Sequence, residues 1–225
     1  MKKPNFLLII VFLLLITLSE SIVFAGTLKE IYINNSGSFV GVTVKFDMGF
    51  PSEVLIDYKG YWDYMETSLP GCVIEINNNG NISILERDSS AHLKFKYGRI
   101  ERITDIPIEY YGNNRVRKVG DLELKYSGGL APYLHKIGDF SIEYDNNRNI
   151  TKFGSLSFGH DYLSSNRRIN RIGEMEIRYD RDGRIKSFGD VDFNYDDNFF
   201  KGPSREIPGV SIKVKIGSDT RKRYK

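Results

Sequence analysis

Ile137-Gly138-Asp139-Phe140-Ser141-Ile142-Glu143-Tyr144-Asp145 recurs in altered form as Ile172-Gly173-Glu174-Met175-Glu176-Ile177-Arg178-Tyr179-Asp180. Related copies open with an apolar residue, usually followed by glycine and a polar residue, and start at Ile103, Val119, Phe153 and Phe188. Successive starts lie 16 to 19 residues apart. A short, nearly constant period indicates one supersecondary unit used repeatedly, with the insertions in turns.

Apolar and polar residues alternate inside each copy. In the first phrase Phe140, Ile142 and Tyr144 are separated by Ser141 and Glu143. A period of two is typical of strands, and polar intervening residues indicate that one face meets water. The equivalent apolar triplets are Ile106, Ile108, Tyr110; Leu122, Leu124, Tyr126; Met175, Ile177, Tyr179; and Val191, Phe193, Tyr195.

A polar turn follows each copy. Asp180-Arg181-Asp182-Gly183 has Asp first and Gly fourth, the pattern of a type I turn followed by a residue with positive φ. In Asp145-Asn146-Asn147-Arg148 and Gly112-Asn113-Asn114-Arg115 we expect an Asn to adopt the left-handed conformation, because Asn tolerates it best after Gly. Each unit is therefore predicted to be one hairpin. The Gly that opens the next unit is predicted to turn or bulge the chain at the opposite edge.

These residues resemble the YD, or RHS, repeats of bacterial exported and toxin-associated proteins, whose core is Tyr-Asp-x-x-Gly-Arg followed by an aliphatic residue. The segment 179–185 fits this pattern fully, and 144–150 fits it with Arg148 in place of Gly. The resemblance covers residues 93–199 and implies a hairpin array. Family arrays form long shells around a toxic domain, but this chain is too short to enclose one. It is also similar to short exported bacterial proteins made of such hairpins, which implies a fold and no activity.

The N-terminal segment 1–25 has the layout of a secretory signal peptide. Lys2 and Lys3 precede an apolar run from Phe6 to Leu18, and Ala25 precedes the expected new N-terminus. An uncleaved membrane anchor is the alternative, but the apolar run is shorter than the ~20 residues needed to span a bilayer. We therefore expect an exported protein, located in the periplasm, at the cell surface or outside the cell.

The remaining chain is predicted to form one all-β domain. Residues 26–102 supply an N-terminal β segment, 103–200 the hairpin repeats, and 201–225 a closing strand and a basic tail. Isolated hairpins are marginal in water, and twist makes a sheet of many strands curl. We therefore expect an antiparallel meander of hairpins rolled into a barrel-like or spiral sheet, with its apolar face inside.

The net charge and the single cysteine limit the ligands and the covalent bonds that are expected for this chain. The net charge is only +3, which argues against nucleic acid as the main ligand. The tail Arg221-Lys222-Arg223-Tyr224-Lys225 is interpreted as a solvated terminus or as an anchor to an anionic surface, such as lipid headgroups or an acidic glycan. Cys72 is the only cysteine, so no intramolecular disulfide forms. We expect it to be a buried small hydrophobe rather than a nucleophile.

The sequence predicts no catalytic centre, metal site or cofactor. His92, His135 and His160 have no metal-ligand spacing, and His135 and His160 are expected to be exposed residues between strands. The carboxylates recur once per repeat, which indicates an architectural role. Asp180-x-Asp182-Gly183 and the stretch 196–198 are similar to parts of calcium loops, but turn chemistry accounts for them. Weak calcium binding along the array stays open.

The best candidate for a ligand site is the aromatic segment Tyr61, Trp62, Asp63 and Tyr64. Exposed aromatic rings beside carboxylates are suited to stacking on sugars and binding their hydroxyls. The alternative is that this cluster is a hydrophobic cap at the open end of the apolar sheet face.

Three functions are compatible with these features. The first is a non-enzymatic exported protein with a structural or surface-interaction role in the envelope or outside the cell. The second is a carbohydrate-binding module that uses the Tyr61-Trp62 region, and the third is a secreted hydrolase.

Overall fold

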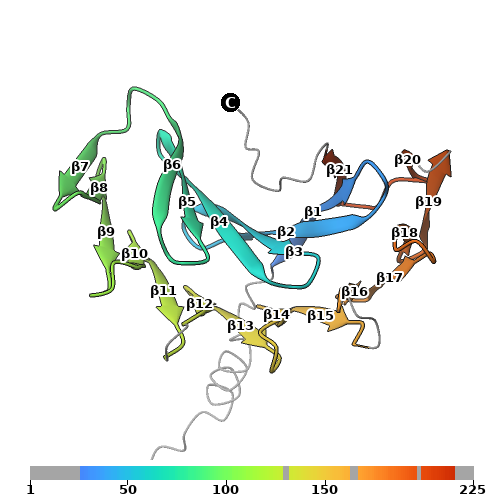
Figure 1. Ribbon diagram of the computed structural model, residues 1–225. Coiled ribbons are helices and arrows are strands. Elements are labelled where there is room, and N and C mark those ends of the chain that lie inside the picture. The colour runs from blue at the N-terminus through green and yellow to red at the C-terminus, as the bar shows by residue number, and fades with distance from the viewer. Residues whose placement is uncertain (1–25, 129–131, 163–166, 197–198, 216–225) are drawn as a thin grey trace, which may run out of the picture.

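The computed structural model describes residues 26–128, 132–162, 167–196 and 199–215. Within these ranges the chain forms 21 strands arranged in two sheets, one of seven strands and one of fourteen (Figure 1). The predicted all-β class is confirmed. Two sheets, however, replace the single rolled sheet that we expected.

The smaller sheet comes from the N-terminal part of the chain. Its first six strands pair antiparallel in chain order, and a seventh, β21, joins β1 in parallel at one edge. The strands are β1 (Thr27–Asn34), β2 (Phe39–Asp47), β3 (Pro51–Asp57), β4 (Trp62–Leu69), β5 (Cys72–Asn77), β6 (Ile82–Arg87) and β21 (Ser211–Lys215).

The larger sheet is the predicted meander of hairpins, in which each strand pairs antiparallel with the next. Its strands are β7 (Leu93–Lys96), β8 (Arg99–Ile103), β9 (Ile106–Tyr110), β10 (Val116–Val119), β11 (Leu122–Tyr126), β12 (Leu134–Ile137), β13 (Phe140–Tyr144), β14 (Ile150–Phe153), β15 (Leu156–His160), β16 (Ile169–Ile172), β17 (Met175–Tyr179), β18 (Ile185–Phe188), β19 (Val191–Asp196) and β20 (Phe199–Pro203).

The meander curves around the smaller sheet without closing (Figure 1). Its outermost strands, β7 and β20, do not pair with each other, so the expected rolled meander is open and is not a closed barrel. The smaller sheet fills the concave side and buries the apolar stripe there. Closure is therefore not needed to keep that stripe out of water.

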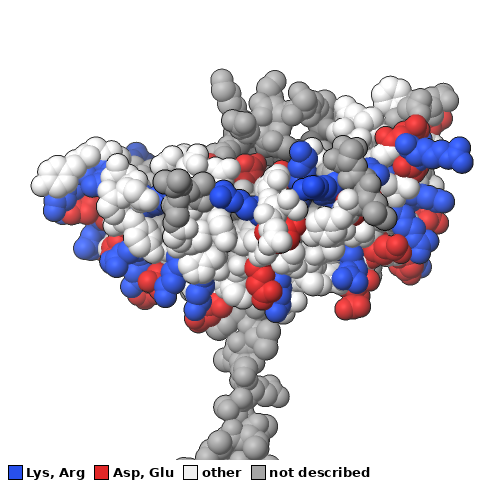
Figure 2. Space-filling view, turned by 60° about the horizontal axis from the view of Figure 1, so that its bottom comes forward, with Lys and Arg blue, Asp and Glu red and all other residues white. Residues whose placement is uncertain are grey.

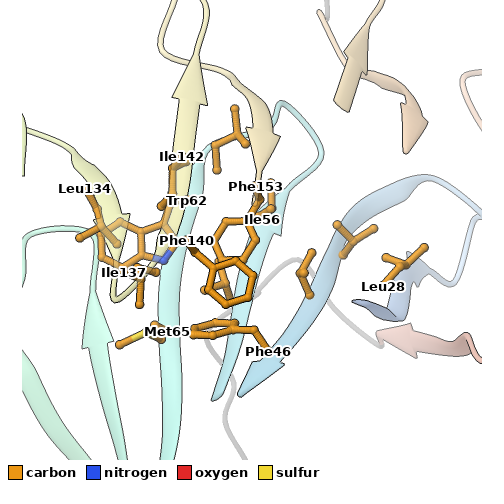
Figure 3. Packing of buried hydrophobic residues seen from close by; sticks show 14 of the residues in the cluster. Leu28, Phe46, Ile56, Trp62, Met65, Leu134, Ile137, Phe140, Ile142 and Phe153 are labelled. Atoms are coloured by element: carbon orange, nitrogen blue, oxygen red, sulfur yellow. The ribbon is translucent and has the colours of Figure 1, made fainter. Parts of the chain in front are cut away.

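The core lies between the two sheets. Phe46 of β2 contacts Phe140 and Phe153 of the meander, with ring centroids 5.0 and 5.6 Å away (Figure 3). Phe140 and Phe153 are themselves stacked at 5.6 Å. Burying one such side chain contributes about 1.5–3 kcal/mol. These three rings therefore join the sheets as well as neighbouring hairpins.

The predicted phase of the repeat strands is confirmed. Ile142 and Ile177 are buried, whereas the adjacent residues Glu143 and Glu176 are exposed. The same alternation buries one central residue in each of the other triplets, namely Ile108, Leu124 and Phe193. The convex face consequently carries the polar side chains.

Glycine turns the chain at one edge of the meander, as predicted. Gly120, Gly138, Gly154, Gly173 and Gly189 have φ between 53° and 58° and open two-residue connections between strands. Positive φ at the first central residue is what a type II′ hairpin turn requires. In the copy without Gly, Thr104 adopts φ 50° at that place.

The opposite edge uses four-residue turns that begin at Asp145, at Asp180 and, in one copy, at Tyr111. Gly183 takes the left-handed place after Asp180, and Asn114 takes it with φ 68°, as expected. In the turn that begins at Asp145, however, Arg148 rather than an Asn has φ 67°, so that expectation is wrong. In each of these turns the fourth residue has the left-handed conformation, whatever its type. In the turn that begins at Asp145 the fourth residue is Arg148.

Arg148 offers a direct test of this strain. A non-glycine residue in the left-handed region costs about 1–2 kcal/mol, so Arg148→Gly is expected to be more stable than Arg148→Ala by about that amount. Both variants lose the guanidinium 5.7 Å from the Tyr133 ring, so the comparison isolates the backbone. Urea unfolding of the two proteins measures the difference. Equal stabilities would show that this turn stores no strain.

Candidate functional site

Trp62, the centre of the predicted ligand site, is a core residue. It opens β4, is only 6% exposed, and packs among Leu134, Ile137 and Ile142 of the meander (Figure 3). It therefore lies between the sheets, not at an open end. The segment that contains it is strand β4, which continues from Trp62 to Leu69 in the smaller sheet.

The other members of the aromatic segment do not share a face with Trp62. Tyr61 is 40% exposed in the turn before β4, and Asp63 and Tyr64 are partly exposed. A register shift separates the pairs Ile56–Trp62 and Leu55–Tyr64. Trp62 and Met65 are therefore buried, while Tyr64 between them is not. The structure consequently offers no accessible indole beside these groups.

The neighbouring carboxylate of Asp57 has a structural role. Its Oδ1 accepts hydrogen bonds from the backbone N–H groups of Lys59 and Tyr61, at 2.9 and 2.8 Å. Burial raises the pKa of Asp57, although these two hydrogen bonds act in the opposite direction. Asp57 therefore begins the same kind of turn as Asp145 and Asp180.

Three such turns of the smaller sheet bond directly to the meander. The carbonyls of Gly37, Gly60 and Gly80 accept hydrogen bonds from the backbone N–H groups of Ile185 (2.9 Å), Ile150 (2.7 Å) and Val116 (2.9 Å). A Cβ on Gly37 would lie 2.1 Å from the Tyr195 ring, so only glycine allows this approach. The shared Asp/Asn-x-x-Gly pattern at 34–37, 57–60 and 77–80 is the signal in the sequence from which these attachments could have been found.

The repeated tyrosines anchor neighbouring strands. The hydroxyl donates to the carbonyl ten residues earlier in three closely matched copies: Tyr144 to Leu134, Tyr179 to Ile169 and Tyr195 to Ile185, each at 2.5 Å. Burial raises the pKa of Tyr195 to about 12, so this hydroxyl stays protonated and continues to donate. The tyrosine of the repeat is therefore a structural hydrogen-bond donor.

Arginine side chains make cation–π contacts with several of these tyrosine rings. The guanidinium carbon of Arg168 lies 3.8 Å from the Tyr179 ring centroid, and that of Arg184 lies 4.9 Å from the Tyr195 centroid. Cation–π contacts of this kind contribute about 0.5–1 kcal/mol at exposed sites. They explain why a basic residue recurs after the turn without assigning it any chemistry.

His160 takes the place of the tyrosine in its repeat. It ends β15, is 8% exposed, and its Nε2 lies 2.8 Å from the carbonyl oxygen of Ile150. A carbonyl only accepts, so Nε2 carries the proton. The expectation that His160 is an exposed turn residue is therefore wrong, because the repeat phase places it in the core. His135 is exposed, as expected, but lies within β12 rather than between strands.

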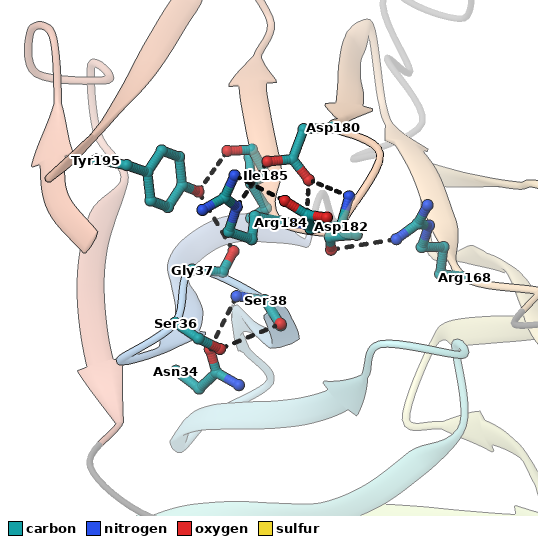
Figure 4. A network of polar contacts seen from close by, with 11 residues as sticks. Asn34, Ser36, Gly37, Ser38, Arg168, Asp180, Asp182, Arg184, Ile185 and Tyr195 are labelled. Carbon is teal, nitrogen blue, oxygen red and sulfur yellow. Dashed lines mark hydrogen bonds and ion pairs between the residues drawn. The ribbon is translucent and has the colours of Figure 1, made fainter. Parts of the chain in front are cut away.

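The Asp180 turn shows how the recurring carboxylates are used (Figure 4). Asp180 accepts from the backbone N–H groups of Asp182 and Arg184, and from Nε of Arg184 at 2.6 Å. Partial burial acts to raise the pKa of Asp180, but the hydrogen bonds from Arg184 outweigh it and hold the pKa below its ordinary value. Its oxygens are thus committed to the turn.

The described residues offer no arrangement suited to metal binding or to thiol chemistry. Among the described residues, no group of three or more His, Cys, Asp or Glu side chains could hold a metal ion. The calcium-like stretch at 196–198 extends outside those residues. Cys72 is buried, and burial raises the pKa of its thiol, which disfavours the reactive thiolate.

The comparisons with known proteins add no relative: no family model, no curated protein and no solved structure matches the chain. In the part of the chain that the structure describes, no helix has the length and apolar character to span a bilayer. The segments 1–25 and 221–225, on which the export and tail expectations depend, lie outside that part.

Proposed function

We propose that this chain is an exported, non-enzymatic β-repeat protein that uses the convex face of its meander as an interaction surface in the cell envelope or outside the cell. The supporting observation is the charge pattern of that face, where acidic and basic side chains are interleaved (Figure 2). Examples are Lys152–Glu143 at 3.4 Å and Arg178–Glu176 at 3.1 Å.

These ion pairs contribute little to folding. The four side chains are between 44% and 63% exposed, and exposed pairs are typically worth about 0–1 kcal/mol. A broad surface of fixed alternating charges instead favours recognition of a complementary charged partner. An anionic or glycan-rich envelope surface fits the export signal and the basic tail expected from the sequence.

Fractionation of a bacterial host that produces the full chain tests this proposal. The protein is expected in the extracytoplasmic fraction and bound to isolated envelopes, from which salt releases it because salt screens exposed charges. Removing two basic groups of the convex face, in the double variant Lys125→Ser and Lys152→Ser, should lower the salt concentration needed for release.

The matched control removes two exposed lysines of the smaller sheet, Lys45 and Lys213, by serine substitution. This control should be released at the same salt concentration as the wild type. Cytoplasmic retention of the chain, or identical release of both double variants, would contradict the proposal.

A carbohydrate-binding site at Tyr61 and Trp62 gains no support from this geometry. The indole ring would have to leave the core before a sugar could stack on it.

A further inference from the structure

One end of the meander exposes large aromatic side chains. Tyr97 is 86% exposed and Phe95 is 58% exposed, both at the hairpin formed by β7 and β8 (Figure 1). β7 is also the outermost strand of its sheet. Exposed aromatic rings at one site are a mark of recognition surfaces, since burial of their faces by a ligand is favourable.

The backbone conformation at position 97 does not favour a tyrosine. Tyr97 and Gly98 connect Lys96 to Arg99 and have φ of 51° and 75°. Two positive φ values define a type I′ turn, in which Asn and Gly are strongly preferred. A bulky residue there is strained, and such strain clusters at functional sites. Neither burial nor turn conformation favours Tyr97. The Lys96 ammonium lies 5.6 Å from its ring centroid, and we take contact with a ligand as the main reason for a tyrosine at this position.

A hollow lies beside this ring. It has a volume of about 350 Å³, within the ~300–1,000 Å³ range of small-ligand sites. Its aromatic lining is Tyr97, Tyr110 and Tyr111, and its polar lining includes Arg99 and Asn114. Rings and hydrogen-bonding groups therefore converge on one space.

The lining groups are held in place before any ligand arrives. Arg99 donates from Nη1 to Oδ1 of Asn114 at 2.7 Å, and its guanidinium carbon lies 5.1 Å from the Tyr110 ring centroid. The Tyr110 hydroxyl donates to the Ile100 carbonyl at 2.8 Å. Fixed side chains lose less conformational entropy on binding, so a preorganised site binds more tightly.

We propose that this hollow binds a saccharide, with Tyr97 stacking on the sugar ring and with Arg99 and Asn114 donating hydrogen bonds to its oxygens. The mixture of rings and amide or guanidinium donors favours a sugar over an apolar peptide, because a sugar offers both an apolar ring face and hydroxyls. This site is separate from the convex face, so it goes beyond the function proposed above.

Affinity electrophoresis of the full chain in gels that contain a soluble β-glucan, xylan or polygalacturonate tests the site. Migration is expected to be retarded by at least one of these polysaccharides. Tyr97→Ala should weaken the retarding interaction at least tenfold. The control Phe199→Ala removes a 69% exposed ring from the opposite end of the meander and should leave it unchanged.

Tyr97→Asn separates binding from folding. Asn suits a type I′ turn, so this variant is expected to melt at a higher temperature than the wild type while losing the retardation. Absence of retardation by all three polysaccharides would overturn the proposal, as would equal retardation of wild type and Tyr97→Asn. Salt release from envelopes, the readout for the convex face, is expected to be unaffected by Tyr97→Asn, so the two proposals fail independently.

Discussion

Tyr144→Ala is expected to lower the free energy of unfolding by about 3–5 kcal/mol, the usual cost of truncating a large aromatic side chain that packs on the core. The ring packs against the core and against Tyr133, with centroids 4.7 Å apart. The variant also leaves the Leu134 carbonyl without the hydroxyl that donates to it at 2.5 Å. Urea unfolding followed by circular dichroism measures the loss.

Two further variants separate the ring from the hydroxyl and from the strand. Tyr144→Phe keeps the ring and should cost only about 1 kcal/mol, the net value of one hydrogen bond. Glu143→Ala changes an exposed residue of the same strand and should stay within about 0.5 kcal/mol. Similar losses for Glu143→Ala and Tyr144→Ala would mean that the strand phase is wrong.

Trp62→Ala is expected to cost a similar amount, about 3–5 kcal/mol, because it leaves a cavity between the two sheets. Trp62 is the only tryptophan of the chain, so its fluorescence reports on this position alone. The wild-type emission should be blue-shifted and poorly quenched by acrylamide, since the side chain is 6% exposed.

Tyr61→Ala is the matched control, because it removes the neighbouring ring from an exposed position. Its effect on the free energy of unfolding should stay below about 0.5 kcal/mol. A readily quenched Trp62, together with a melting temperature that Trp62→Ala leaves unchanged, would place the indole at the surface and restore the stacking-site hypothesis.

The hairpins could be predicted because their determinants are local. Alternation of Phe140, Ile142 and Tyr144 fixes which face is buried, and the Gly that follows the apolar start in most copies fixes a turn. The phase of a strand follows from such a pattern without knowledge of its partner. The same reasoning identified the Asp180 turn and the left-handed Gly183.

What covers the apolar face could not be predicted, because it depends on contacts between distant segments. Nothing local to Phe46 shows that it packs on Phe140. The register shift that buries Trp62 and exposes Tyr64 is likewise set by pairing with β3. His160 stands where other repeats have tyrosine, so the phase of the repeat is the signal that could have identified it as a buried residue.

The Tyr97 hollow was also outside the reach of sequence reasoning. Tyr97 forms the tip of a two-residue turn with Gly98, which the alternation of the neighbouring residues does not indicate. Its exposure beside a hollow is a property of the assembled fold.

The bonds from the carbonyls of Gly37, Gly60 and Gly80 to the meander bear on how such a chain can evolve. Ordinary repeat arrays gain and lose units readily, because each unit contacts only its neighbours. Here the three glycine carbonyls of the smaller sheet accept hydrogen bonds from the first residues of β18, β14 and β10, respectively. Duplication of one hairpin between these points would carry every later strand past its partner. The number of internal repeats is therefore constrained by a segment that lies outside the array. The backbone N–H of Phe200, which donates to the Asn35 carbonyl, and the pairing of β21 with β1 extend this constraint to the C-terminal end of the array.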